Sequence, residues 1–171
     1  NELRDAIGYV PQDAFLFSDT ISNNIKFGLG DLDEDGNELM EQAAKDAHIY
    51  DNIVEFDKGF ETVVGERGIT LSGGQKQRVS IARAIIKEPD ILVFDDCLSA
   101  VDTETEDIIL RNLKRIMEGK TSVIISHRIS SLEHADLIIV MNEGEIIERG
   151  SHEELMAQNG YYTSLNEKQK G

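Results

Sequence analysis

Two continuous apolar runs constrain the fold of this chain more than any other feature. ILVF covers residues 91–94, and TSVIIS covers residues 121–126. Short apolar runs without alternation are typical of strands that are buried on both faces. Between them, Thr103 and Glu106 form a predicted capping box, followed by an apolar stripe at helical spacing. We therefore expect a strand–helix–strand unit in an α/β sheet that is partly parallel.

The remaining segments alternate in the same way. AIGYV (6–10) is a predicted strand that stops at Pro11, and LIIVM with EIIERG is a predicted hairpin. The stretch from about 20 to 70 holds no convincing strand and is interpreted as a helical insertion. The polar tail after Leu165 is expected to fray. Helices are predicted over 20–25, 38–47, 49–56, 72–87 and from Ser151 onward, where Glu154 completes a capping box.

The charge balance restricts the class of partner. Seventeen Lys and Arg against 33 Asp and Glu give a net charge of −16, which argues against nucleic-acid binding. The single cysteine, Cys97, excludes an internal disulfide. DLDEDG (31–36) matches the first half of a calcium loop, but Gln42 stands where the twelfth position needs glutamate. We interpret that segment as a solvated acidic loop.

LSGGQ (71–75) has the composition of a backbone that lies against phosphate. Ser72 is a predicted helix N-cap with Gln75 three residues later, and Gly73 and Gly74 allow close approach of a ligand. Such a grip normally works beside a G-x-x-x-x-G-K-[ST] loop between a strand and a helix.

The sequence of this chain contains no such loop. Its only Gly-Lys-Thr is at 119–121, where Lys114 replaces the first glycine. That stretch also follows a helix and precedes a strand, which is the reverse of the required order. We interpret Gly119 as a helix C-cap.

Carboxylates and polar residues follow the predicted strands. Asp95 and Asp96 end the first apolar run, where one carboxylate could hold Mg²⁺ and the other could orient water. A strand end with two solvated acids is the plain alternative. His127 follows the second run and Gln12 follows Pro11. Each of these two would be unremarkable alone, and a histidine after a strand is more often structural.

Order and spacing make these residues specific, because the chain resembles the nucleotide-binding domain of ABC transporters of the exporter type. Five ordered motifs and two flanking segments carry the resemblance over nearly all 171 residues. They are VPQDAFLFSDTISNNI (the Q-loop region, with Gln12), LSGGQ (the signature), ILVFDD (Walker B), SAVD (the D-loop, 99–102), ISHR (the switch histidine, His127), TVVGERG (62–68) and GEIIERGSHEEL (144–155).

The resemblance implies a partial RecA-like P-loop NTPase core with a helical signature subdomain. The subdomain would span about 13–88, and the half with Walker B, D-loop and switch histidine would span 89–171. Two such domains would pack head to tail, with the signature of one over the ATP of the other. The cofactors would be ATP and Mg²⁺. The implied roles are catalytic for Asp96, His127 and Gln12, metal-binding for Asp95 and Gln12, and nucleotide-binding for Ser72, Gly73, Gly74, Gln75 and Asp102.

Two departures from the family shape the functional hypothesis. The chain begins after the expected Walker A loop, so we expect a fragment or truncated product that is inactive alone. Asp96 replaces the usual glutamate after the Walker B aspartate, which is typical of degenerate sites in heterodimeric exporters. A slow homodimer is the alternative. The Q-loop region and TVVGERG would contact a transmembrane domain at the cytoplasmic face of a membrane. Two other functions stay open: a non-catalytic module that completes a partner's site, and a soluble DNA-repair-type ABC ATPase.

Overall fold

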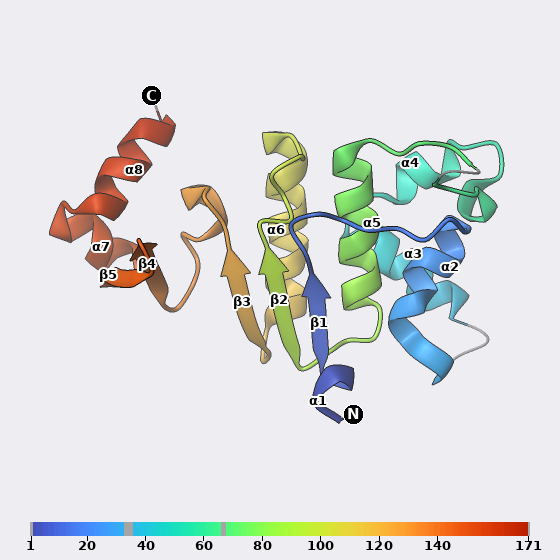
Figure 1. Ribbon diagram of the computed structural model, residues 1–171, viewed down its shortest axis with the longest axis horizontal. Coiled ribbons are helices and arrows are strands. Elements are labelled where there is room, and N and C mark those ends of the chain that lie inside the picture. Colours follow the sequence, from blue (N-terminus) through green and yellow to red (C-terminus); the bar gives the residue numbers. More distant parts are fainter. Residues whose placement is uncertain (1, 33–35, 66–67, 171) are drawn as a thin grey trace. The chain divides into compact units, whose positions relative to one another are not determined.

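The computed structural model describes residues 2–32, 36–65 and 68–170, and the chain forms two compact units, 1–125 and 126–171. Parts of the predicted acidic loop (33–35) and of TVVGERG (66–67) lie outside the described residues. The elements of the first unit (Figure 1) are α1 (Glu2–Asp5), β1 (Ile7–Val10), α2 (Ile21–Lys26), η1 (Phe27–Leu32), α3 (Asn37–Asp46), α4 (Tyr50–Val54), η2 (Gly59–Glu61), α5 (Gly73–Ile85), β2 (Ile91–Asp95), α6 (Thr103–Met117) and β3 (Thr121–Ile125).

A three-stranded parallel sheet organises the first unit. The strand order is β1-β2-β3, and Figure 1 shows the three strands side by side with β2 in the centre. Val10 pairs with Phe94, and Asp95 pairs with Ile125. The carboxyl ends of all three strands therefore meet at one edge of the sheet. The predicted α/β fold is confirmed, and so is the strand–helix–strand unit formed by β2, α6 and β3.

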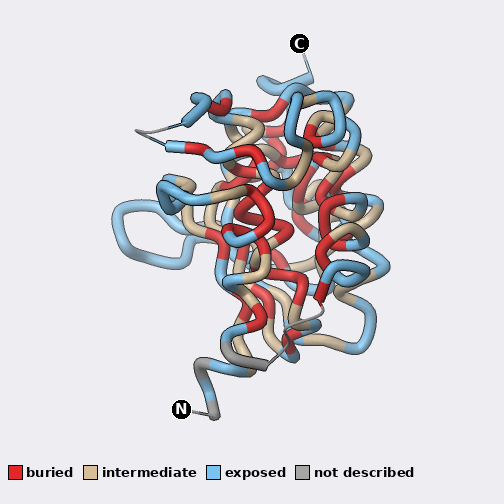
Figure 2. The backbone as a smooth tube through the Cα atoms, turned by 90° about the vertical axis from the view of Figure 1, so that its right-hand side faces the viewer, coloured by how far each residue is buried: buried red, intermediate tan, exposed pale blue. Residues whose placement is uncertain are grey.

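The prediction that both apolar strands are buried on two faces is wrong. Leu92 and Phe94 are buried in the core, whereas Val93 between them is only partly buried. On β3, Val123 is 47% exposed and Ile125 is 51% exposed. The buried face packs into one cluster with residues of α5 and α6, and Figure 2 marks these buried positions along the backbone. Within the described part of the first unit, the opposite face is far less covered.

Helix α5 is the central helix of the first unit. It starts after Ser72 with the predicted capping box to Gln75, and it ends at Ile85, two residues before the predicted end. It packs against β1, α2 and α3, and Val79, Ile81 and Ala82 are fully buried there. Its position brings the LSGGQ motif to the surface at one end while the rest of the helix lies in the core.

The cap of α6 differs from the prediction. Asp102, not Thr103, is the N-cap, and its carboxylate accepts a hydrogen bond from the Thr105 amide at 2.9 Å. Thr103 is already helical, so its side chain lies one residue too late to cap. The predicted stripe is confirmed at Ile109 and Leu113, which are buried. Asp102 thus joins the D-loop to α6 directly.

The insertion after β1 is helical, as predicted. Thr20 caps α2 by accepting from the Asn23 amide at 3.0 Å. Only isolated bridges occur among the described residues of this stretch, Thr20 with Val63 and Val64 with Ile69. Helix α4 is shorter than the predicted 49–56.

The described elements of the second unit are the short helix η3 (Ile129–Ser131), the hairpin strands β4 (Ile138–Asn142) and β5 (Glu145–Gly150), and the helices α7 (His152–Gln158) and α8 (Tyr161–Lys170). The hairpin is confirmed as antiparallel, and the capping box of Ser151 and Glu154 opens α7. The prediction that the tail frays after Leu165 is wrong. Helix α8 continues to Lys170, because the Gln169 side chain bonds the amide of Ile129 and the carbonyl of His127.

Two further features concern the chain as a whole. Among the described residues, no helix has both the length and the apolar character needed to cross a membrane. The two compact units divide at residue 125, whereas the predicted subdomains divide at 88. The latter division follows family roles, so it stays a prediction.

Candidate nucleotide-binding site

Two carboxylates lie where β2 ends. Asp95 is the last residue of the strand, and Asp96 follows with a left-handed backbone, φ 43°. The Asp96 amide donates to the Ile125 carbonyl at 2.8 Å, and its own carbonyl accepts from Ser99 Oγ at 3.0 Å. These bonds hold the backbone in a conformation that aspartate tolerates better than most residues. Both side chains are only partly buried, so they can reach a ligand.

The end of β1 supplies a polar side chain to each carboxylate. Tyr9 lies opposite Val93, on the same face as Asp95, and its hydroxyl donates to Asp95 Oδ2 at 3.2 Å. Gln12 Nε2 donates to Asp96 Oδ2 at 3.5 Å, the long end of the hydrogen-bonding range. Desolvation raises the pKa of Tyr9, and the hydrogen bond to Asp95 adds to the effect. Tyr9 therefore stays protonated, and a donor, in neutral solution.

This donor set suits Mg²⁺. Proteins usually hold Mg²⁺ through one or two carboxylates together with the phosphates of a nucleotide. Asp95 presents a carboxylate at the sheet edge, and Gln12 keeps its amide oxygen for a cation because its nitrogen faces Asp96. Within the described residues, no cluster of three or more His, Cys, Asp or Glu side chains is placed to hold a metal ion. The fit rests on Asp95 with Gln12, and the assignment stays a prediction.

The start of α5 presents the LSGGQ motif at the surface. Ser72 Oγ accepts from the Gln75 amide at 3.2 Å, and the Gln75 side chain accepts from the Ser72 amide at 2.9 Å. Ser72 and Gly73 are exposed. A hydroxyl that accepts one bond can still donate its own hydrogen, and the helix N-terminus carries partial positive charge. The arrangement can therefore bind an anion, while the Gln75 side chain holds the Ser72 backbone in the capping box.

The D-loop packs directly on this helix start. A side chain at Gly74 would place its Cβ 2.9 Å from the Ala100 carbonyl oxygen, so glycine is needed here for a contact inside the chain. Gln77 bonds both Ser99 and Ala100. The hydrogen bond from the Thr105 amide lowers the pKa of Asp102. The D-loop, which ends at Asp102, thus packs against the start of α5, where Ser72 and Gly73 lie.

The predicted site residues fall into three places. Gln12, Asp95 and Asp96 come together at the sheet edge, and the signature residues lie at the start of α5. His127 is exposed and belongs to the second unit, where its carbonyl accepts from Gln169 Nε2 at 2.6 Å. Its position against the carboxylates stays a prediction.

The segment that follows β1 is anchored on α5. Arg83 donates to the Phe15 carbonyl at 2.8 Å and to the backbone and side-chain oxygens of Asn24 at 2.7 and 2.8 Å. Asn24, which is fully buried, in turn bonds both backbone groups of Phe17. This network fixes the Q-loop region while the Phe15 ring stays exposed.

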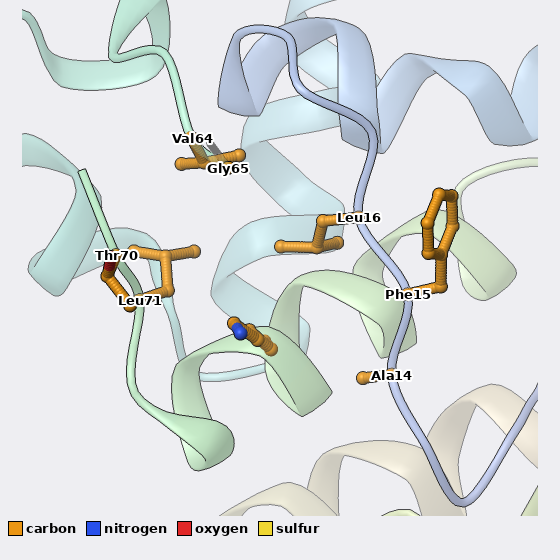
Figure 3. Close-up of a pocket in the computed structure, with 8 residues that line it drawn as sticks. Ala14, Phe15, Leu16, Val64, Gly65, Thr70 and Leu71 are labelled. Carbon is orange, nitrogen blue, oxygen red and sulfur yellow. The ribbon is translucent and has the colours of Figure 1, made fainter. Parts of the chain in front are cut away.

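A pocket of about 370 Å³ lies beside that segment (Figure 3). Figure 3 shows Leu16 pointing toward Val64 and Leu71, and the Phe15 ring pointing away from them. The lining residues are Ala14, Phe15, Leu16, Val64, Gly65, Thr70, Leu71 and Lys76. The pocket therefore lies between the Q-loop region and the segment that includes TVVGERG, and the Asp95–Asp96 pair is not among its lining residues.

Sequence reasoning missed two residues. Tyr9 could have been found from strand alternation, since pairing the two strands in parallel puts it diagonal to Asp95. Gln77 had no such signal, because its partners lie 22 and 23 residues away on a loop without regular structure.

Comparison with known proteins agrees with these motifs. The family model described as ABC transporter matches residues 1–99. A probable multidrug resistance ABC transporter ATP-binding/permease protein of Bacillus subtilis is 49% identical over 99% of this chain and 28% of its own length. The ATP-dependent lipid A-core flippase of Pseudomonas fluorescens is 49% identical over 96% of this chain and 27% of its own length.

A solved structure gives the same result. A bacterial Atm1-family ABC exporter with ATP bound superimposes with a TM-score of 0.91 at 43% identity, over 99% of this chain and 29% of that one. The chain thus spans less than a third of the length of each of these three proteins. The matched family model, these relatives and the shared fold show that this chain belongs to the ABC transporter family.

Proposed function

We propose that this chain works in the ATP-driven motor domain of a membrane exporter. It would contribute an intact signature to a partner's ATP site and a degenerate Walker B end to its own. The observation that carries the proposal is the start of α5, where the capping box presents exposed Ser72 and Gly73 at a positive helix end. The family membership supports the same reading.

In its own site the chain would use the edge of the sheet. Asp95 and Gln12 would hold Mg²⁺, which neutralises phosphate charge when MgATP is bound. Asp96 would stand where the family's glutamate orients the attacking water, and His127 would donate to the terminal phosphate. The aspartate arm is one methylene shorter than glutamate, about 1.5 Å, and a misplacement of about 1 Å can reduce a rate about 100-fold. Slow turnover at this site follows.

The signature would act across a dimer. Ser72, Gly73, Gly74 and Gln75 would lie over ATP held by the lysine loop of a second ABC nucleotide-binding domain, packed head to tail. Asp102 would border the same interface. The signature is intact, whereas the carboxylate of Asp96 is short. This combination favours a heterodimer, in which the signature would serve an active site on the partner while the chain's own site turns over slowly.

A transmembrane domain would dock on the anchored Q-loop region. Phe15, Phe17 and Phe27 form an exposed aromatic group, with ring centroids 5.2 and 4.7 Å apart for successive pairs. Exposed apolar groups next to a pocket are typical of interaction sites. The pocket between Leu16 and Leu71 would receive a segment of the membrane domain, and this chain would then lie at the cytoplasmic face of a membrane.

The test compares the isolated chain with the complete transporter. Calorimetry with MgATP should show binding weaker than millimolar for residues 1–171 alone, because no lysine loop is present in the sequence. The complete transporter in lipid vesicles should hydrolyse MgATP, and Asp95→Asn should remove MgATP from the site containing Asp95. Micromolar affinity of the isolated chain, or a transporter without ATP hydrolysis, would contradict the proposal.

A further inference from the structure

Gln77 is a buried polar side chain that joins two functional segments. It lies one turn into α5 and is only 5% exposed. Its Nε2 donates to Ser99 Oγ at 3.3 Å, and its Oε1 accepts from the Ala100 amide at 3.1 Å. Both ends of the amide therefore hold the D-loop, and buried polar groups are usually placed for such bonds.

The connection continues to the residue that carries the candidate catalytic carboxylate. Ser99 Oγ donates to the Asp96 carbonyl at 3.0 Å. The Asp96 amide bonds the Ile125 carbonyl, and its backbone is left-handed. A shift of Ser99 would therefore act on a backbone conformation with few alternatives.

The same loop also touches the first turn of α5. The Ala100 carbonyl lies 2.9 Å from where a Cβ on Gly74 would be, and the Ala100 Cβ lies 3.3 Å from a Cβ on Gly73. Displacement of the helix start would thus press on Ala100, while Gln77 fixes the distance between helix and loop. Packed contacts of this kind transmit displacement because neither side can yield freely.

We propose that Gln77 is a positioning residue that couples the signature to Asp96. Through it, occupation of the partner's ATP site at Ser72 and Gly73 changes the geometry of the Asp96 backbone in the chain's own site. The inference rests on the proposed function for its catalytic consequence. The hydrogen-bonded path from Gln77 through Ser99 to Asp96 stands independently of it.

Three variants of the complete transporter test the catalytic consequence. Gln77→Leu keeps the size and removes both hydrogen bonds. It should lower kcat at the partner's ATP site about tenfold, with KM for MgATP within about twofold, because the helix start and the D-loop are no longer held together. Gln77→Glu should recover part of kcat, because a carboxylate oxygen can still accept from the Ala100 amide. Gln42→Leu is the matched control, since Gln42 is an exposed helical glutamine away from the site, and it should change neither constant.

A double substitution tests the path. Gln77→Leu and Ser99→Ala break the same connection, so their combined effect on kcat should be smaller than the product of the single effects. Independent, multiplicative effects would contradict a path through Ser99.

Amide hydrogen exchange separates this proposal from the proposed function. The peptide containing Ala100 should exchange faster in Gln77→Leu, and it should keep the parent rate in Gln42→Leu. Unchanged exchange and unchanged kcat, with only a lower unfolding temperature, would show a purely structural role and overturn the proposal. A parent transporter without ATP hydrolysis would contradict the proposed function, while exchange would still decide whether Gln77 positions the loop.

Discussion

The start of α5 and the end of β2 both carry residues assigned to ATP chemistry, but they are supported differently. The start of α5 has a reciprocal capping box, a glycine contact to Ala100 and a buried glutamine one turn later. At the end of β2, Tyr9 and Gln12 are exposed, and they reach the carboxylates at 3.2 and 3.5 Å. At the end of β2 the Asp96 backbone is therefore fixed by hydrogen bonds to Ile125 and Ser99, whereas the Asp95 and Asp96 side chains have only long, exposed contacts.

This difference matches the proposed division of labour. A signature that serves a partner's active site must hold its geometry without help from its own nucleotide. A degenerate site places no such demand on Asp96, whose arm is already short. Substitutions at the two places should therefore differ in size and in the site that they affect.

The largest effect is expected from Gly73→Asp in the complete transporter. A carboxylate at the start of α5 is favourable to the helix dipole, so the fold should persist. The same charge would repel the terminal phosphate in the partner's site, and hydrolysis there should fall at least about 100-fold. Nucleotide trapping resolved by site gives the measurement.

Gly144→Asp serves as the control, because Gly144 lies in the hairpin turn with open space around it, and its φ of 83° is in the region that aspartate tolerates better than most residues. That variant should hydrolyse ATP like the parent. If Gly73→Asp instead emptied the site that contains Asp95, the signature would act in its own site and the comparison would fail.

The second effect, several-fold, is expected at Asp96. Asp96→Glu should raise turnover at this chain's own site, because it lengthens the arm by one methylene. The gain is limited because glutamate tolerates a φ of 43° less well than aspartate. Asp96→Asn should change little. Single-site hydrolysis, with the partner's catalytic glutamate disabled, measures both, and a robust activity abolished by Asp96→Asn would identify a working catalytic base.

Much of this arrangement could be predicted from sequence because its signals are local. The capping boxes at Ser72 and Ser151, the parallel strands and the nearness of Gln12 to Asp96 follow from spacing and strand order. Three features did not follow. The exposure of Val123 and Ile125 depends on what packs over that face of the sheet, which the sequence of the strand does not tell. The cap of α6 lies at Asp102, one residue before the predicted position. Helix α8 is held by the contacts of Gln169 with the carbonyl of His127 and the amide of Ile129, which are distant in sequence.

A smaller effect, on stability, is expected at Asp102. The hydrogen bond from the Thr105 amide lowers the pKa of Asp102 below its ordinary 3.8. A lowered pKa in the folded state stabilises the fold above the unfolded pKa, and this contribution is lost as pH falls through the folded pKa. Asp102→Ala should therefore unfold at a lower temperature than the parent at pH 7, with the difference shrinking below about pH 4. Asp102→Asn, which can still cap, should retain most of the midpoint at pH 7, and a pH-independent difference for Asp102→Ala would contradict the charged cap.

The smallest effect is expected at Cys97, directly after the carboxylate pair. Cys97 is 3% exposed, and burial raises the pKa of its thiol to about 12. At pH 8 only on the order of one thiol in ten thousand is then ionised, so iodoacetamide should leave the folded chain unmodified while it labels the chain in denaturant. The comparison becomes sharper in Gln77→Leu, because a loop released from α5 should expose Cys97 and speed its labelling. Mass spectrometry of timed samples gives both rates. Rapid labelling of the parent would show that the loop after β2 already exposes Cys97 without that substitution. The backbone of this loop would then be no more rigid than the side chains of Asp95 and Asp96.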